Sequence, residues 1–188
     1  MLHFRDECWD LHPEVCPCDV HFVEFLDDRR IHDAAIFHFG TGNHHLVGIS
    51  AGENGRNNSV LGITASPDEI QTYVKLSIER PSISRHYKAF FGDIYQLDAR
   101  LLPAFDVVSL FHLCEFRGAE NEAYGALTDL DLALMLTDKL RPGGFLLFYK
   151  GSKAFINRAR HEIAKLEQQR PLQRAADYKT LVVYRKAS

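Results

Sequence analysis

The sequence predicts an α/β fold built around a mostly parallel sheet. Three observations support this prediction: apolar strand-like runs alternate with amphipathic helical segments, short connections join them, and a glycine turn follows the first strand. The 188 residues are 46% hydrophobic and 25% charged, which is typical of one globular domain with a sizeable core. We expect residues 33–188 to form this domain and residues 1–32 to form an N-terminal segment.

The first strand and its turn are expected in residues 35–44, which read Ala-Ile-Phe-His-Phe-Gly-Thr-Gly-Asn-His. Glycine adopts backbone angles that are closed to other residues, and without a Cβ it lets a ligand lie against the main chain. The turn at Gly40 and Gly42, followed by a helix, is therefore one way to hold a nucleotide-like ligand. The same two glycines are also compatible with an ordinary turn at the end of a strand.

A second strand at Ser59–Thr64 leads into a helix with clear start and stop signals. Ser66 can cap this helix, Pro67 suits its first position, and Glu69 places a carboxylate three residues after the cap. The helix is expected to continue until Pro81. The apolar residues that recur at helical spacing along it are Ile70, Tyr73, Val74 and Ile78.

Two more strands, a helix and a further strand are expected in the middle of the chain. A short strand at residues 89–91 ends in a turn, and residues 105–113 form a nearly continuous apolar run that suits a strand buried on both faces. Leucines at helical spacing mark a helix within residues 127–140. Residues 145–149 then form another buried strand.

The C-terminal part of the chain predicts a helix and a hairpin. Ser152 can cap a helix that ends at Pro171. The last strand, residues 181–184, is expected to lie antiparallel to a weak strand within residues 172–178, because the two residues between them leave no room for a crossover helix. The inward face of the helix is expected to consist of Phe155, Ala159, Ile163 and Leu166.

Four sequence blocks, taken in order, resemble those of the class I S-adenosylmethionine-dependent methyltransferases. They are the turn at Gly40 and Gly42, the Gly-Asp turn at residues 92–93, the strand at residues 105–108 and the Leu-Arg-Pro-Gly-Gly block at residues 140–144. The resemblance covers roughly residues 33–186. It implies a Rossmann-like seven-stranded sheet with helices on both faces and a reversed last strand, and S-adenosylmethionine lying across the carboxyl ends of the first strands.

The resemblance also implies which residues hold the cofactor. Gly40 and Gly42 would pass close to its methionine part, Asp93 would accept a hydrogen bond from the adenine amino group, and Ile94 would pack on the adenine ring. The segment that begins at Phe111 would lie near the sulfonium and the substrate. The full set of expected cofactor-binding residues is His38, Gly40, Gly42, Thr64, Asp93, Ile94 and Phe111.

Three positions depart from the family pattern. His38 stands where an acid usually precedes the first glycine, His44 stands where a third glycine is common, and Thr64 stands where an acid usually holds the ribose hydroxyls. A charged hydrogen bond contributes about 1.5–3 kcal/mol against about 1 kcal/mol for a neutral one, so the hydroxyl could weaken binding about tenfold. Asp68 or Glu69 is an alternative carboxylate for the ribose, although both also suit the first turn of a helix.

His112 and Glu115, just after the fourth strand, are the candidate catalytic residues. Methyl transfer requires donor and acceptor to be held in contact and, where the acceptor is protonated, a base that removes the proton. Histidine titrates near neutrality, which suits that task. The alternative is a partly buried structural histidine beside a surface glutamate.

The N-terminal segment concentrates cysteine and histidine, the ligand types that zinc accepts. The spacing of these residues does not match a common zinc module, so we predict no metal site and expect thiols packed in a segment that folds over the cofactor pocket. The resemblance to the methyltransferases implies that residues 1–32 are a candidate lid, with Trp9, His12 and His21 facing the substrate. A metal site remains the alternative. The residues concerned are Cys8, His12, Cys16, Cys18 and His21.

The charge and hydropathy of the sequence indicate which kinds of substrate and partner we expect. The net charge is −3, with no basic stripe interleaved with aromatic residues, which disfavours nucleic acid as substrate. The absence of a long apolar run and of a signal peptide predicts a cytoplasmic protein without a membrane span. We expect a small-molecule substrate in a pocket that is open or is completed by a second subunit, as in a homodimer.

These features predict a methyltransferase that uses S-adenosylmethionine and acts on a small molecule. Two alternatives stay open. One is a binding or scaffolding protein that keeps the fold without catalysis, which His38, His44 and Thr64 favour. The other is an enzyme that transfers a different group of the same cofactor, such as its aminocarboxypropyl group.

Overall fold

A computed structural model, which describes residues 7–53 and 55–187, contains a seven-stranded sheet with the strand order β3-β2-β1-β4-β5-β7-β6. β1 to β5 run parallel, whereas β7 is antiparallel to both β5 and β6. The predicted sheet with a reversed last strand is therefore confirmed. The strands are β1 (Ala35–Phe39), β2 (Ser59–Thr64), β3 (Tyr87–Phe91), β4 (Phe105–Ser109), β5 (Leu140–Tyr149), β6 (Leu172–Arg174) and β7 (Leu181–Lys186).

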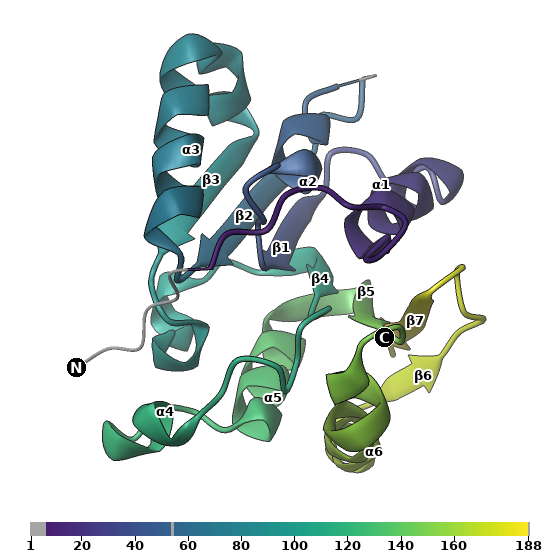
Figure 1. The fold of residues 1–188 in the computed structure, drawn as a ribbon. Coiled ribbons are helices and arrows are strands. Elements are labelled where there is room, and N and C mark those ends of the chain that lie inside the picture. The colour runs from purple at the N-terminus through teal and green to yellow at the C-terminus, as the bar shows by residue number, and fades with distance from the viewer. Residues whose placement is uncertain (1–6, 54, 188) are drawn as a thin grey trace.

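Helices cover both faces of the sheet (Figure 1). One face carries α1 (Cys18–Asp28), α2 (Leu46–Ser50) and α3 (Pro67–Glu79), and the other carries α5 (Asp129–Lys139) and α6 (Arg160–Gln169). The short helix α4 (Ala119–Ala123) lies between β4 and α5. Among the described residues, no helix is long and apolar enough to cross a bilayer.

Alternating side chains of the strands build two separate cores. In β1, Ile36 packs with the residues of α1 and α2, whereas Phe37 and Phe39 pack with those of α5. Val107 and Val108 divide in the same way along β4. Successive residues of a strand point to opposite faces, so a central strand covered on both sides is mostly apolar.

α3 starts and ends where the sequence predicts, but two of the apolar residues that recur at helical spacing along it are exposed. The hydroxyl of Ser66 accepts a hydrogen bond from the backbone N–H of Glu69 at 3.4 Å, as expected of an N-cap. Tyr73 packs on the core, whereas the side chains of Val74 and Ile78 are 50% and 74% exposed. The helix covers the edge of the sheet, where only part of its apolar surface meets another element.

The predicted strand at residues 105–113 is too long. β4 ends at Ser109, and the chain then turns through residues 110–115, where Cys114 has a φ of +69°. Leu110 and Leu113 are apolar because they fill the core from this turn, at 1–2% exposure, and not because they belong to a strand. The turn brings His112 and Glu115 to the carboxyl end of the strand.

The helix α1 was not predicted from the sequence. Phe22 and Phe25 on its inner face are fully buried, so it forms part of the core. The guanidinium of Arg56 donates to Asp27 at 2.5 Å and thereby ties its end to the loop before β2. At the other end of the chain, Ser152 caps the turn Phe155–Ala159 that leads into α6, as predicted.

Candidate active site

A cavity of about 660 Å³ opens at the carboxyl ends of β1 to β5. The loops that follow these strands form its floor, and residues 7–19 of the N-terminal segment form the opposite wall. Open parallel sheets bind ligands at this edge, where the chain switches direction between neighbouring strands. Of the nine residues predicted for the site, the cavity is lined by Gly40, Gly42, Thr64, Asp93, Ile94, His112 and Glu115.

The glycine turn after β1 needs glycine at both positions. Gly40 has a φ of +87° and Gly42 a φ of +56°, the left-handed region that other residues rarely adopt. A Cβ at residue 40 would lie 3.0 Å from Cδ2 of His112. A Cβ at residue 42 would collide with the imidazole of His44. The turn therefore allows two imidazoles to approach the main chain at the cavity wall.

A carboxylate from α3 occupies the end of β2. The hydroxyl of Thr64 donates to Oε2 of Glu69 at 2.6 Å, and the hydroxyl of Thr41 donates to the same oxygen at 3.2 Å. Glu69 is 6% exposed and lines the cavity. Of the two carboxylates considered at the start of this helix, only Glu69 faces the site, whereas Asp68 is exposed.

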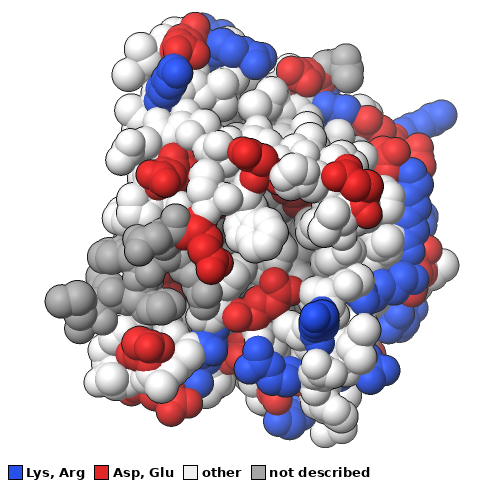
Figure 2. Space-filling view, viewed as in Figure 1, with Lys and Arg blue, Asp and Glu red and all other residues white. Residues whose placement is uncertain are grey.

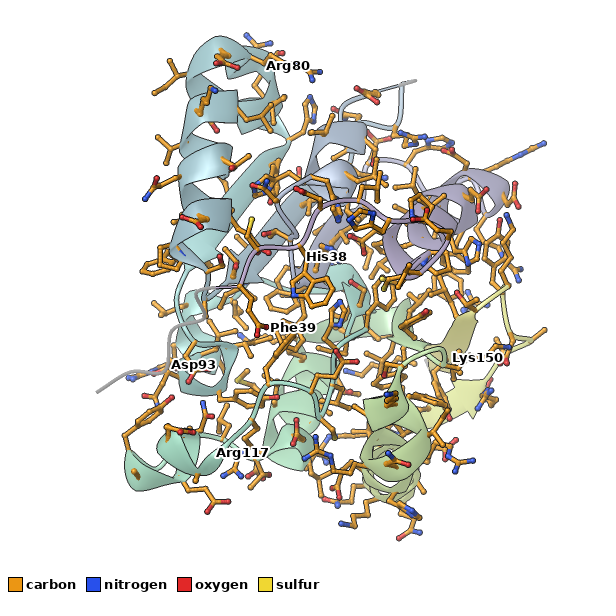
Figure 3. All side chains as sticks on the ribbon, viewed as in Figure 1. His38, Phe39, Arg80, Asp93, Arg117 and Lys150 are labelled. Carbon is orange, nitrogen blue, oxygen red and sulfur yellow. The ribbon has the colours of Figure 1, made fainter. Side chains whose placement is uncertain are left out.

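Asp93 lies two residues after the end of β3, and three donors hold its carboxylate. Oδ1 accepts from the backbone N–H of Tyr95 at 2.9 Å, and Oδ2 accepts from Asn121 at 2.7 Å and from the hydroxyl of Tyr124. Figure 3 shows Asp93 beside α4, well away from His38. A carboxylate has about four acceptor positions, so one position on Oδ1 remains available to a ligand.

Two of the predicted cofactor-binding residues do not line the cavity. His38 and Phe111 are each 2% exposed, and their ring centroids lie 5.8 Å apart within the core. Phe22 of α1 packs against both rings. The helix that the sequence did not reveal thus separates these side chains from the cavity.

Asp19 of α1 belongs to the site, although the sequence did not predict it. It lines the cavity, is 6% exposed, and lies 3.6 Å from the Nε2 atoms of both His38 and His44. The sequence signal that could have found it is an acid in the first turn of an amphipathic helix with Phe22 and Phe25 at helical spacing.

His112 and Glu115 form a hydrogen-bonded pair in the wall of the cavity. Nδ1 of His112 lies 2.9 Å from Oε2 of Glu115, which turns the opposite edge of the ring toward Gly40. Burial alone would lower the pKa of His112, but the carboxylate of Glu115 outweighs it and raises this pKa above the ordinary value. The pair has the arrangement of a base and the group that orients it.

Two thiols lie at the N-terminal wall. The Sγ atoms of Cys16 and Cys18 are 3.4 Å apart. The hydrogen bond with Cys18 lowers the pKa of Cys16 to about 6, whereas it raises that of Cys18, together with burial. Within residues 7–53 and 55–187, no group of three or more His, Cys, Asp or Glu side chains is placed to hold a metal ion.

The N-terminal wall is connected to the glycine turn. The backbone N–H of Asn43 donates to the carbonyl of Trp9 at 2.8 Å, and the side chain of Asn43 donates to Asp10 at 3.0 Å. Trp9 lines the cavity and is 59% exposed. A role for this segment as a lid, with Trp9 facing the substrate, stays a prediction.

No protein-family model matches the chain, and no curated protein matches it in sequence. Solved structures do match its fold. The magnesium protoporphyrin IX methyltransferase ChlM of Synechocystis PCC 6803, solved with bound S-adenosylmethionine, has a TM-score of 0.65 at 13% identity, over 91% of this chain and 79% of that one. The cyclase SpnF has a TM-score of 0.64 at 14% identity, over 99% and 88% of the two chains.

A further match is an O-methyltransferase family protein of Burkholderia thailandensis, with a TM-score of 0.58 at 14% identity, over 92% of this chain and 55% of that one. Similarity at this level of identity concerns the fold, and a cyclase among the matches illustrates that one fold can serve different reactions. The strand order, the reversed last strand and these matches agree with the sequence motifs. The chain therefore has the fold of the class I S-adenosylmethionine-dependent methyltransferases.

Proposed function

We propose that this chain binds S-adenosylmethionine and transfers its methyl group to a small-molecule acceptor. The observation that carries the proposal is the buried carboxylate of Glu69 at the end of β2, 2.6 Å from the hydroxyl of Thr64. Thr64 occupies the position at which the family usually has an acid for the ribose hydroxyls. Glu69 supplies from α3 the charge that the strand itself lacks.

The excess of acidic side chains in the cavity wall favours a cationic ligand. Lys153 is the only Lys or Arg among the described residues that line it. Figure 2 shows the same imbalance on this face, with acidic side chains around its centre and basic ones toward α6 and the C-terminal hairpin. S-adenosylmethionine carries a sulfonium and an ammonium, both of which a negative cavity attracts. The acids that line the cavity are Glu7, Asp10, Asp19, Glu69, Asp93 and Glu115.

The residues present fit the remaining parts of the cofactor. The turn at Gly40 and Gly42 offers main chain without side chains, as a ligand that lies against the backbone requires. Asp93 retains an acceptor position for the adenine amino group, and Ile94 lines the cavity beside it. Glu69 would accept from the ribose hydroxyls.

His112 is the group that would remove a proton from the acceptor. Bound S-adenosylmethionine supplies an electrophilic methyl group. Glu115 holds Nδ1 of His112, so Nε2 is the nitrogen left to take a proton from a hydroxyl or amine in the cavity. A pKa somewhat above the ordinary value keeps this base within reach of neutral pH.

The positions of Glu69 and Asp19 argue against the main alternative function. A binding or scaffolding protein without catalysis is favoured by the loss of acids at His38 and Thr64. Glu69 beside Thr64 and Asp19 beside His38 place carboxylates at both positions. Product analysis would separate methyl transfer from transfer of the aminocarboxypropyl group, because the first leaves S-adenosylhomocysteine and the second leaves methylthioadenosine.

The test is calorimetric titration with S-adenosylmethionine and S-adenosylhomocysteine. We expect Glu69→Gln to weaken both ligands about tenfold, because a charged acceptor for the ribose becomes neutral while the side chain keeps its shape. The matched control is Glu79→Gln, an exposed acid on the same helix, which should bind like the parent protein. No heat from the parent protein at millimolar ligand would contradict the proposal.

A further inference from the structure

Two thiols meet in the cavity wall where α1 begins. Cys16 and Cys18 are separated by one proline, and both line the cavity. Their Sγ atoms lie 3.4 Å apart, which is contact without a covalent bond, since the two sulfurs of a disulfide are about 2.05 Å apart. Rotation of two neighbouring side chains, without movement of a distant element, would therefore join them.

Cys18 keeps its proton at neutral pH. The hydrogen bond with Cys16, burial and the carboxylate of Asp19 all raise the pKa of Cys18. Its single S–H points to one of two acceptors, Sγ of Cys16 at 3.4 Å or Oδ1 of Asp19 at 3.6 Å. The nearer of the two is Cys16, so Cys18 is the donor of this thiol pair.

Cys16 is a thiolate at neutral pH. The hydrogen bond from Cys18 lowers the pKa of Cys16 to about 6, and the imidazole of His112 and the backbone N–H of Cys18 act in the same direction. Burial and the charge of Asp19 oppose this shift without cancelling it. The neighbouring phenol of Tyr149 stays neutral, because burial and the two thiols raise its pKa to about 12.

The positions of the two sulfurs suit a nucleophile and a resolving thiol. The thiolate is the reactive form of cysteine, and reactive cysteines lie beside helix N-termini and imidazoles. Cys16 lies just before Pro17, the N-cap of α1, and is half-buried in the cavity wall, so a small electrophile in the cavity can reach it. Cys18 is 3% exposed, yet it is within reach of any group attached to Sγ of Cys16.

We propose that Cys16 and Cys18 form a reversible disulfide by reaction with a small disulfide that enters the cavity. The thiolate of Cys16 attacks one sulfur of that molecule, which forms a mixed disulfide and releases the other sulfur as a thiolate. Cys18 gives its proton to the released thiolate, and its own sulfur then attacks Sγ of Cys16. The Cys16–Cys18 bond forms, and the second half of the small disulfide leaves as a thiolate.

The reaction is balanced and reversible. The small disulfide gains two electrons and becomes two thiols, and the pair of cysteines loses two electrons. A disulfide across so short a loop gains little from loop closure and is readily reduced again. The inference does not depend on methyl transfer, because it concerns the thiols of the cavity wall alone.

The first test measures which thiol reacts. The protein is labelled at pH 6 with a limiting amount of iodoacetamide, and the modified cysteines are identified by mass spectrometry. We expect Cys16 to react about tenfold faster than Cys8, the internal control. Cys8 is exposed but its pKa is raised by burial and nearby acids, whereas Cys16 is half ionised at this pH. Labelling of Cys16 that is no faster than that of Cys8 would overturn the proposal.

The second test follows the bond. The reduced protein is incubated with oxidised glutathione, and the remaining free thiols are blocked and mapped by mass spectrometry. We expect the parent protein to lose the thiols of Cys16 and Cys18 together, without retained glutathione, and to recover both in dithiothreitol. Cys18→Ser should stop at a mixed disulfide between Cys16 and glutathione, whereas Cys8→Ser should behave like the parent protein. A parent protein that keeps both thiols free, or that retains glutathione on Cys16, would overturn the proposal without any variant.

Discussion

His112, His44 and His45 differ in pKa because their neighbours differ. Glu115 raises the pKa of His112 against the effect of burial, whereas burial lowers the pKa of His44 and brings that of His45 to about 4. His45 has no carboxylate partner, since its two ring nitrogens meet the hydroxyl of Tyr87 and the carbonyl of Glu69. Of these three histidines, His112 is therefore the one suited to exchange a proton near neutral pH.

The carboxylate of Glu115 should determine the titration of His112. In Glu115→Gln we expect the pKa of His112 to fall, because the stabilising charge 2.9 Å from Nδ1 is removed. The acidic limb of any methyl-transfer rate should move to lower pH by the same amount, since the base form then persists to lower pH. Proton NMR titration of the imidazole measures this directly. Glu122→Gln, an exposed acid that pairs with Arg117, is the control, and an unmoved His112 titration in Glu115→Gln would contradict the prediction.

At the scale of elements, α1 connects the N-terminal wall of the cavity to the core. The ring of Phe25 lies 5.5 Å from the ring of Phe145 in β5 and 5.5 Å from that of Tyr178 before β7. Its side chain is fully buried. The position of Asp19 in the cavity therefore depends on packing that the apolar face of the same helix provides.

Removal of the Phe25 ring should destabilise the whole protein. We expect Phe25→Ala to lower the free energy of unfolding by about 3–5 kcal/mol, because a large aromatic side chain leaves a cavity in the core. Val15→Ala, which changes a side chain that is 72% exposed, should lie within about 0.5 kcal/mol of the parent protein. Urea unfolding measures both. A loss below about 1 kcal/mol for Phe25→Ala would mean that α1 can detach without unfolding the domain.

At the scale of the whole molecule, His45 joins three elements in one buried contact. It precedes α2, and its Nδ1 lies 2.7 Å from the hydroxyl of Tyr87 in β3. Its Nε2 lies 2.8 Å from the carbonyl of Glu69 in α3. The ring donates from Nε2 and accepts at Nδ1, an arrangement that requires the neutral form.

This contact predicts a loss of stability in mild acid. The pKa of His45 is about 4 in the folded protein and about 6.5 in an unfolded chain, so the unfolded state binds the proton first as the pH falls. The free energy of unfolding should therefore decrease between about pH 6.5 and pH 4, by up to about 3 kcal/mol. Urea unfolding across this range measures it.

The matched variant removes the titrating group. His45→Asn keeps a polar side chain that tolerates the left-handed backbone at this position, where φ is +47°. Its stability should depend less on pH over this range than that of the parent protein. His12→Asn, at an exposed histidine, should keep the parent dependence. A parent protein whose stability stays constant from pH 6.5 to pH 4 would contradict the assignment.

Elements whose signals are local could be predicted from the sequence. β2 and the start of α3 lie where the apolar run and the Ser66 cap predict them, because strand formation and capping depend on neighbours a few residues away. The glycine turn follows for the same reason. The hydrogen bond between His112 and Glu115 depends instead on the turn after β4, where the sequence predicted a longer strand. The order of these elements predicted a mostly parallel sheet, and the resemblance to the methyltransferases predicted its seven strands with a reversed last strand.

Which charges meet in the cavity depends on the packing of distant elements and could not be predicted from the sequence. Asp19 reaches His38 and His44 because α1 packs on the sheet, and no pattern within a few residues of Asp19 specifies that contact. Glu69 faces Thr64 and Thr41 because the chain folds back at the start of α3. A strand or a cap is set by short-range sterics and hydrogen bonds, whereas a binding site brings together side chains from distant parts of the chain, whose approach depends on the packing of the whole core.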